Sequence, residues 1–254
     1  MADYAASTYG DRIAEVYDTY PHLPKDTDDA VEFLASIAGR GRVLELGIGT
    51  GRVALPLAAR GLRVSGIDAS QAMVKQLRAK PRGKEIAVAI GNFAEVKVPG
   101  QYSLIYVVFN TFFALLRQDA QVRCFERAAR RLSRDGVFVI EAFVPDLTRF
   151  DRGQRTSASS VTTDSVLLET SVIDIAEQYN RSAHVEISQQ GIRFYPVQLR
   201  WAFPGELDLM ARLAGLRLRE RFGGWKRETF GPGSGRHVSV YERAARVAAP
   251  KRKR

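Results

Sequence analysis

Residues 43–52, VLELGIGTGR, constrain the fold of this chain more than any other segment. Apolar residues flank Glu45 and lead into three glycines, Gly47, Gly49 and Gly51, each separated by one residue. This pattern predicts a buried strand that ends in a tight turn before a helix. Because glycine has no Cβ, a ligand can approach the backbone there, at the carboxyl end of the first strand, where open α/β sheets bind their ligands.

An acidic residue, Asp68, ends the next apolar run at 62–67. A carboxylate at the end of the second strand can hold both hydroxyls of a ribose. The dinucleotide fingerprint is G-x-G-x-x-G, whereas this turn reads G-x-G-x-G and places Arg52 where the third glycine of the fingerprint would stand. Glu45 would repel a pyrophosphate but suits a cation such as an ammonium group. Both details argue against a dinucleotide.

Strand and helix patterns alternate along the first 150 residues. Short apolar runs predict strands, and runs with helical periodicity predict helices, one of them capped by Ser70. The expected strands cover 42–46, 62–67, 85–90, 104–109 and 137–143, the last after a turn at 134–136, and the expected helices cover 27–38, 52–60, 70–80 and 120–133. We therefore predict an α/β fold, a doubly wound, mostly parallel, seven-stranded Rossmann-like sheet.

The pattern changes after residue 150. A polar loop at 151–160 is expected to precede an inserted antiparallel β meander with a turn at 189–191. The strands of the meander are expected at 161–169, 170–175, 182–188 and 192–200, followed by a helix at 204–214 and strands at 216–222 and 237–242. The expected organisation is an N-terminal aromatic helical lid at 1–26, a core at 27–150, an inserted substrate or dimer region at 151–203, a final αββ unit at 204–245 and a disordered basic tail at 246–254.

With its Glu45, its glycine spacing and the later Asp68, the E-L-G-x-G-T-G core resembles the class I S-adenosylmethionine-dependent methyltransferases. The resemblance covers about residues 30–145 and the final αββ unit. S-adenosylmethionine carries an ammonium, a sulfonium and a ribose but no phosphate, which agrees with the acidic residues around the turn. The resemblance implies this cofactor, with S-adenosylhomocysteine as the product.

The resemblance also implies which residues contact the cofactor. The glycines shape the turn, Asp68 holds the ribose, and Ala69 and Met73 flank the adenine. Asn92 stands where the family often has an aspartate, and its amide can still pair with the adenine amino group. The expected cofactor contacts are Tyr17, Glu45, Gly47, Gly49, Gly51, Asp68, Ala69, Met73, Asn92, Phe93 and Phe109.

The segment at 109–113, FNTFF, follows the fourth strand, at the edge that faces the transferring methyl group in the family. Adenine-N6 DNA methyltransferases carry an Asn/Asp-Pro-Pro-aromatic tetrad there, and this segment lacks the prolines. Together with the N-terminal tyrosines and 203–207, FPGEL, it resembles small-molecule N- and O-methyltransferases of natural-product pathways, including sugar amine methyltransferases. The expected acceptor contacts are Asn110, Phe112, Phe113, Trp201 and Trp225, with core packing as the other reading of the aromatic residues.

An amine acceptor needs little more than a neutral nitrogen, whereas a hydroxyl acceptor needs a general base. Candidate bases are His22, Glu141 and His237, although none has a partner visible in the sequence. The third histidine, His184, is expected to face solvent or a packed surface. A single cysteine, Cys124, sits in a helical pattern and is expected to be a buried or half-buried helix residue rather than a nucleophile. No metal site is expected from one cysteine and three scattered histidines.

The net charge is +10, to which the last four residues contribute four. A basic balance is consistent with nucleic acid or with solvated arginines, and the sequence has no recognisable nucleic-acid module. The alternatives kept open are an RNA or DNA methyltransferase, a nicotinamide-dependent oxidoreductase and a non-catalytic cofactor-binding protein. Without a long apolar run or a signal-peptide pattern, a cytoplasmic protein with a small-molecule substrate and no membrane contact is expected, and a homodimer is left open.

Overall fold

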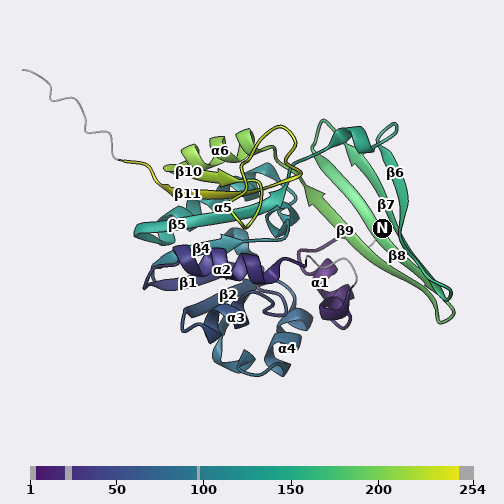
Figure 1. Cartoon of the computed structure of the whole chain (residues 1–254), viewed down its shortest axis with the longest axis horizontal. Coiled ribbons are helices and arrows are strands. Elements are labelled where there is room, and N and C mark those ends of the chain that lie inside the picture. The colour runs from purple at the N-terminus through teal and green to yellow at the C-terminus, as the bar shows by residue number, and fades with distance from the viewer. Residues whose placement is uncertain (1–3, 21–24, 96–97, 246–254) are drawn as a thin grey trace, which may run out of the picture.

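The computed structural model describes residues 4–20, 25–95 and 98–245. It contains a seven-stranded sheet, sheet A, in the order β10-β11-β5-β4-β1-β2-β3, and a separate four-stranded sheet, sheet B, in the order β6-β7-β8-β9 (Figure 1). The strands of sheet A are β1 Arg42–Leu46, β2 Arg63–Asp68, β3 Ala87–Ile90, β4 Tyr102–Val107, β5 Leu132–Phe143, β10 Leu216–Phe222 and β11 Arg236–Arg243. β11 runs antiparallel to both of its neighbours, while β1 to β5 pair in parallel. The predicted fold class, including the inserted antiparallel meander, is confirmed.

Alternate residues of the parallel strands supply the two cores of sheet A. In β4, Ile105 and Val107 pack into the cluster that contains Phe125 of α5, whereas Tyr106 packs into the cluster that contains Phe33 of α2. Both faces are therefore buried, as expected for a central parallel strand. The helices are α1 Thr8–Ile13, α2 Thr27–Ile37, α3 Ala54–Ala59, α4 Gln71–Ala79, α5 Gln118–Arg131 and α6 Pro204–Leu213. Ser70 caps α4 as predicted, because its Oγ accepts a hydrogen bond from the N–H of Met73.

The predicted turn at 134–136 lies inside a strand instead. β5 begins at Leu132, which pairs with Tyr102, and the register then shifts before Val137 pairs with Leu104. Gly136 sits at this irregularity, where a Cβ would lie 2.7 Å from the carbonyl oxygen of Tyr102. The turn-like composition thus marks a bulge in a continuous strand rather than a reversal of the chain.

Sheet B differs from the prediction at its start. Its strands are β6 Gln154–Val161, β7 Ser165–Asp174, β8 Tyr179–Ser188 and β9 Gly191–Arg200, so most of the expected loop at 151–160 is a strand, and the chain turns between Val161 and Ser165. The turn at 189–191 is confirmed. Polar pairs such as Thr156 and Thr170, whose Oγ1 atoms are 3.1 Å apart, join β6 to β7. Because these residues lack apolar alternation, periodicity could not identify the strand.

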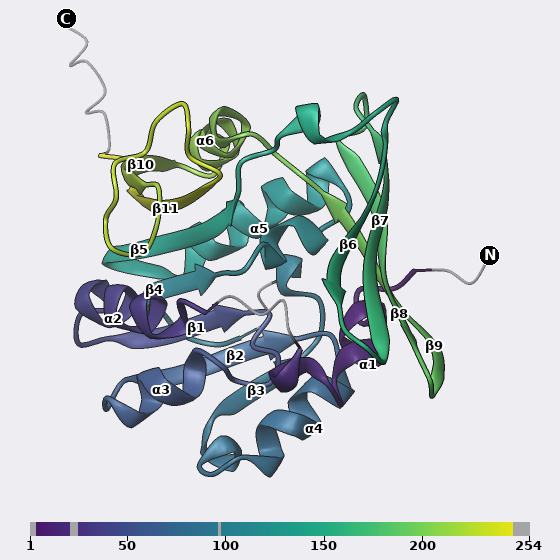
Figure 2. The ribbon, with the colours of Figure 1, turned by 45° about the vertical axis from the view of Figure 1, so that its right-hand side comes forward.

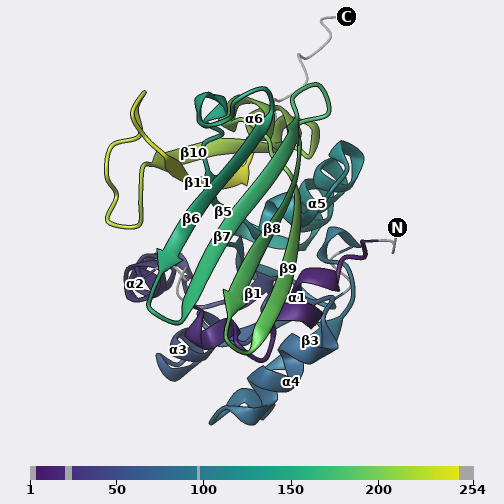
Figure 3. The ribbon, with the colours of Figure 1, turned by 90° about the vertical axis from the view of Figure 1, so that its right-hand side faces the viewer.

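Sheet B is anchored to the rest of the molecule by Arg200, at the end of β9. Its guanidinium is buried and donates hydrogen bonds to Gln121 of α5, to Gln178 and to Glu206 of α6. Figure 3 shows the strands of sheet B passing in front of sheet A, and Figure 2 shows α1 lying between sheet B and α4. Among the described residues, no helix is both long and apolar enough to cross a membrane.

Candidate functional site

The glycine turn after β1 adopts a backbone that favours glycine. Gly47, Gly49 and Gly51 have φ values of 77°, 55° and 78°. A Cβ on Gly47 would lie 2.5 Å from Cγ2 of Thr111, and one on Gly51 would lie 2.3 Å from Cδ1 of Leu77, so these two glycines allow close packing of the turn. A Cβ on Gly49 would meet nothing within 4 Å. The middle of the turn therefore borders open space, into which its backbone can present a ligand-binding surface.

Asp68, at the end of β2, lies beside this turn. Its Oδ2 accepts a hydrogen bond of 2.7 Å from the N–H of Gly49, and its Oδ1 accepts one of 2.8 Å from the N–H of Ser70. Burial raises the pKa of the carboxyl, and these hydrogen bonds oppose the rise. A carboxylate has about four lone-pair directions, so two protein donors fix its orientation and leave capacity for two hydroxyl groups.

Glu45 lies beneath the turn, with 4% of its surface exposed. It accepts a hydrogen bond of 2.8 Å from the hydroxyl of Tyr106 on β4. Burial raises the pKa of Glu45 to about 8, while this hydrogen bond and the charge of Arg52 oppose the rise. A further cation that comes close to this buried carboxyl would stabilise its ionised form.

Arg52 lies at the centre of the site, although in the sequence it served only as an argument against a dinucleotide. Its guanidinium stacks over the ring of Phe109 at 3.8 Å from the centroid and lies 6.0 Å from the centroid of Tyr17. It also donates a hydrogen bond of 3.1 Å to Oγ1 of Thr27 at the start of α2. Arg52 thereby joins the glycine turn, the end of β4 and the N-terminal segment.

The chain after β4 is held in an unusual backbone conformation. Phe109 and Asn110 both have positive φ values, 56° and 64°. The buried carboxyl of Glu141, on β5, accepts a hydrogen bond of 2.5 Å from the N–H of Phe109, and Oδ1 of Asn110 accepts one of 2.7 Å from the N–H of Phe143. These contacts offset a strain of about 1–3 kcal/mol per residue and fix the Asn110 side chain.

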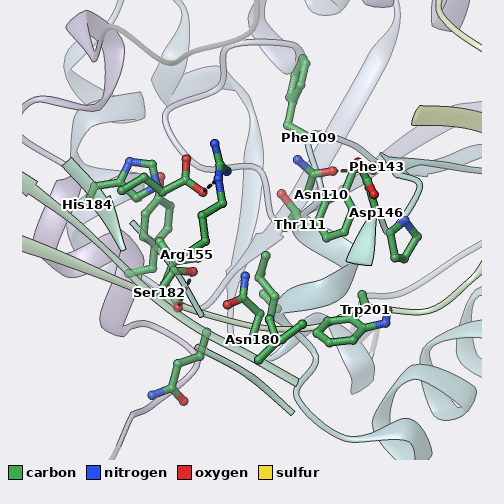
Figure 4. Close-up of a pocket in the computed structure, with 18 of the residues that line it drawn as sticks. Phe109, Asn110, Thr111, Phe143, Asp146, Arg155, Asn180, Ser182, His184 and Trp201 are labelled. Carbon is green, nitrogen blue, oxygen red and sulfur yellow. Dashed lines mark hydrogen bonds and ion pairs between the residues drawn. The ribbon is translucent and has the colours of Figure 1, made fainter. Parts of the chain in front are cut away.

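A cavity of about 620 Å³ opens at this point, between the carboxyl edge of sheet A and the inner face of sheet B. This volume is within the range of small-molecule sites. Figure 4 shows Phe109, Asn110 and Thr111 on one side, with Asn110 turning its amide nitrogen away from Phe143. Of the residues predicted to bind cofactor or acceptor, the cavity is lined by Tyr17, Phe109, Asn110 and Trp201. Tyr4, Tyr9 and Tyr20 of the N-terminal segment line it as well.

The remaining predicted cofactor residues lie around the glycine turn rather than in this cavity. Met73 is buried against the α1 side, in a cluster with Ile13. Ala69 follows Asp68 directly, and the buried Phe93 comes within 4.0 Å of a Cβ placed on Gly47. Two of these residues, Phe93 and Asn92, follow β3; Asn92 is exposed, and its Oδ1 accepts a hydrogen bond from the N–H of Ala94. The structure therefore gathers these side chains at the carboxyl ends of β1, β2 and β3.

Three residues predicted to bind the acceptor lie elsewhere. Phe112 and Phe113 are fully buried and pack edge-to-face against Phe125 and Phe143 respectively, so they are core residues. Their short helical turn directs both rings inward and leaves Thr111 toward the cavity. Trp225 is buried in the cluster on the opposite side of sheet A, with Phe33. Core packing, the other reading of these aromatic residues, describes all three.

The two predicted bases that the structure describes, Glu141 and His237, do not line the cavity. Glu141 is committed to the N–H of Phe109, and burial raises its pKa to about 7. His237 is fully buried on β11, with Nδ1 2.8 Å from Oγ of Ser239, and burial and then the charge of Arg221 lower its pKa to about 3. His22 lies outside the described residues. Cys124 is buried in α5, as expected. Among the residues that the structure describes, no group of His, Cys, Asp and Glu is arranged to hold a metal ion.

Sheet B adds polar residues to the cavity for which the sequence predicted no role. They are Arg155, Glu169, Asn180, Ser182, His184 and Gln198. His184, expected to face solvent or a packed surface, lies in the cavity wall with its ring 5.8 Å from that of Tyr20. Alternation within β8, in which Asn180, Ser182 and His184 share a face, was visible in the sequence. Which face of the sheet turns inward was not, because it depends on how sheet B docks.

Known proteins that are similar to this chain in sequence and structure are methyltransferases. Residues 43–136 match a family model described as a methyltransferase domain. The CcbJ methyltransferase of Streptomyces caelestis shares 40% identity and a TM-score of 0.90, over 95% of this chain and 100% of that one. The cypemycin N-terminal methyltransferase of a Streptomyces species is 26% identical over 93% of this chain and 98% of its own length. An S-adenosylmethionine-dependent methyltransferase of Clostridium acetobutylicum has the same fold, with a TM-score of 0.78 at 12% identity over 92% of this chain and 98% of that one. This chain belongs to the S-adenosylmethionine-dependent methyltransferases.

Proposed function

We propose that this methyltransferase transfers its methyl group to an amine nitrogen of a small molecule made in a natural-product pathway. The observation that carries the proposal is the cavity at the carboxyl end of β4, because it adjoins the glycine turn and is large enough for a small acceptor. The name of the cypemycin relative specifies methylation of an N-terminus, which supports nitrogen as the acceptor atom.

The residues around the turn fit S-adenosylmethionine. Gly49 borders open space, Asp68 is oriented to accept two hydroxyl groups, and the buried Glu45 favours a cation. The aromatic residues Tyr17 and Phe109 line the neighbouring cavity, where a sulfonium would gain cation–π attraction. We propose that Arg52, close to both rings, pairs with the carboxylate of the methionine part.

Bound S-adenosylmethionine supplies an electrophilic methyl group on its sulfonium. The protein itself must align the acceptor nitrogen with that methyl group and keep water away from the reacting atoms. Asn110 is held rigidly by Phe143 and directs its amide toward the cavity, so it can orient the acceptor. Alignment of two reactants in this way lowers a barrier by roughly 7–11 kcal/mol.

A hydroxyl acceptor needs a general base, whereas an amine acceptor does not. Neither Glu141 nor His237 lines the cavity, so neither is placed to remove a proton from a hydroxyl group there. A neutral amine already has the lone pair that the reaction needs. Glu169 and His184 do line the cavity, so the assignment of nitrogen rests on the cypemycin relative, and transfer to oxygen is the outcome that would contradict it.

A labelled-methyl assay tests the proposal. The protein is incubated with S-adenosylmethionine carrying a ¹³C methyl group and with a panel of small primary amines and alcohols matched in carbon skeleton. We expect S-adenosylhomocysteine to accumulate only with amines, and NMR to place the ¹³C methyl group on nitrogen. Transfer to the alcohols but not to the amines would contradict the proposal.

A further inference from the structure

The cavity has two walls of different chemistry. The wall from sheet A and the segments that follow its strands is largely apolar and aromatic, with Phe109, Phe143 and Phe150. The wall from sheet B carries charged and amide side chains. Figure 4 shows Arg155 and Asn180 there, and Glu169 lines the same wall. Because the apolar wall borders the glycine turn, the polar wall faces the part of an acceptor that is remote from the transferred methyl group.

Arg155 of β6 and Glu169 of β7 form a loose ion pair in this polar wall. The closest nitrogen and oxygen atoms are 3.9 Å apart, and the two side chains keep 27% and 37% of their surface exposed. At this distance they share no hydrogen bond, so the donors of the guanidinium and the lone pairs of the carboxylate stay available to a third group.

A second ion pair attached to sheet B shows what a structural pair looks like in this protein. Arg200 and Glu206 lie 2.8 Å apart with 8% and 18% of their side-chain surface exposed, and Arg200 is bound by Gln121 and Gln178 as well. By contrast, a partly exposed pair such as Arg155 and Glu169 contributes little to stability. Stability alone does not account for placing these two charges in a ligand-sized cavity.

We propose that Arg155 and Glu169 determine acceptor specificity by binding a neutral, hydroxyl-bearing part of the acceptor, an inference that rests on the proposed function. A hydroxyl group donates to the carboxylate and accepts from the guanidinium, so it satisfies both members at once. An anionic substituent would meet the charge of Glu169, and a cationic one that of Arg155. Asn180, Ser182 and Gln198, which donate and accept in the same wall, suit further hydroxyl groups.

The test compares two amines with the same six-carbon chain. D-glucamine bears a hydroxyl group on each carbon except the one that carries the amine, and hexylamine bears no hydroxyl group. We expect the wild-type protein to have a kcat/KM for D-glucamine at least about tenfold above that for hexylamine. Glu169→Gln and Arg155→Gln should lower the value for D-glucamine about tenfold or more, as expected for loss of a charge-assisted hydrogen bond, mainly through KM. The value for hexylamine should stay within about twofold.

The matched control is Arg181→Gln on β8, between Asn180 and Ser182 but on the opposite face of the sheet, where its side chain is exposed. It should leave both values unchanged, and calorimetry should show unchanged cofactor affinity in all variants. No preference of the wild-type protein for D-glucamine, or an equal loss on both amines in the variants, would overturn the inference while methyl transfer itself stands. Cofactor binding without transfer to either amine would instead contradict the proposed function, and the inference with it.

Discussion

The hydroxyl of Tyr106 donates a hydrogen bond of 2.8 Å to Glu45, and this bond joins β4 to β1 directly beneath the glycine turn. Both side chains are buried, and burial raises the pKa of Glu45 to about 8. Burial and the neighbouring Glu45 also raise the pKa of Tyr106. Burial therefore favours the protonated form of Glu45, and a bound cation would favour its ionised form.

Glu45 gives a specific pH dependence of stability in the absence of ligand. Its pKa is raised above the value of an unfolded glutamate, so between about pH 4.5 and pH 8 the folded state binds more protons than the unfolded state. The contribution of Glu45 to the free energy of unfolding must then fall as the pH rises through this window. We expect Glu45→Gln to gain stability relative to the wild type between pH 5 and pH 8 in urea unfolding. A constant difference across that range would contradict the assignment.

Asp68→Ala should lose most of the affinity for S-adenosylmethionine. The carboxylate is expected to accept two hydroxyl groups, and hydrogen bonds to charged groups contribute about 1.5–3 kcal/mol each, so the dissociation constant should rise about a hundredfold or more. Asp135→Ala, exposed at the opposite end of sheet A, serves as the control and should bind normally. Equal affinities in calorimetry would show that Asp68 only supports the turn through Gly49 and Ser70.

Asn110 and Phe112, two residues apart, should respond in opposite ways. Asn110→Gly removes the amide yet keeps a residue that tolerates the φ of 64°, so we expect lower kcat with a small change in stability. Phe112→Ala removes a fully buried ring and should cost about 3–5 kcal/mol of stability. Denaturant unfolding and steady-state kinetics on both variants separate these effects. Normal kcat in Asn110→Gly would remove Asn110 from the acceptor site.

Arg200→Leu should loosen sheet B. The substitution leaves Glu206 without its buried partner, which costs about 3–5 kcal/mol for a buried pair. We expect faster amide hydrogen exchange in β8 and β9 than in β1 and β4, since the latter lie in the core of sheet A. Uniform acceleration across both sheets would mean that sheet B does not open independently.

The sequence was sufficient for most of sheet A, because the parallel strands are apolar on both faces and the helices have clear periodicity. Predicted and observed bounds coincide for β1 and for β10 and differ by a few residues in the other strands of sheet A. In sheet B, the two strands expected at 161–169 and 170–175 are the single strand β7. The strand β6 was missed because its cross-strand contacts are polar, as in the pair Thr156 and Thr170. The hydrophobic pattern of a short segment describes a residue and its neighbours along the chain. It carries little information about polar contacts between two strands.

The site divides in the same way. The glycine turn and Asp68 could be identified from the sequence because their spacing along the chain is itself the motif. The positions of Arg155, Glu169 and His184 in the cavity wall depend on how sheet B folds back over the end of β4, which no short motif encodes. Phe112 shows the converse error, since an aromatic residue beside a site motif can point into the core instead.

The most direct test of the account is calorimetric titration of the protein with S-adenosylmethionine and, separately, with NAD, at pH 7 in buffers of different ionisation enthalpy. The account predicts one-to-one binding of S-adenosylmethionine, no binding of NAD, and release of about one proton per cofactor bound, because the cationic ligand ionises Glu45. Proton release should disappear in Glu45→Gln. Binding of NAD, or no binding of S-adenosylmethionine by the folded protein, would contradict the assignment of this turn as the cofactor site.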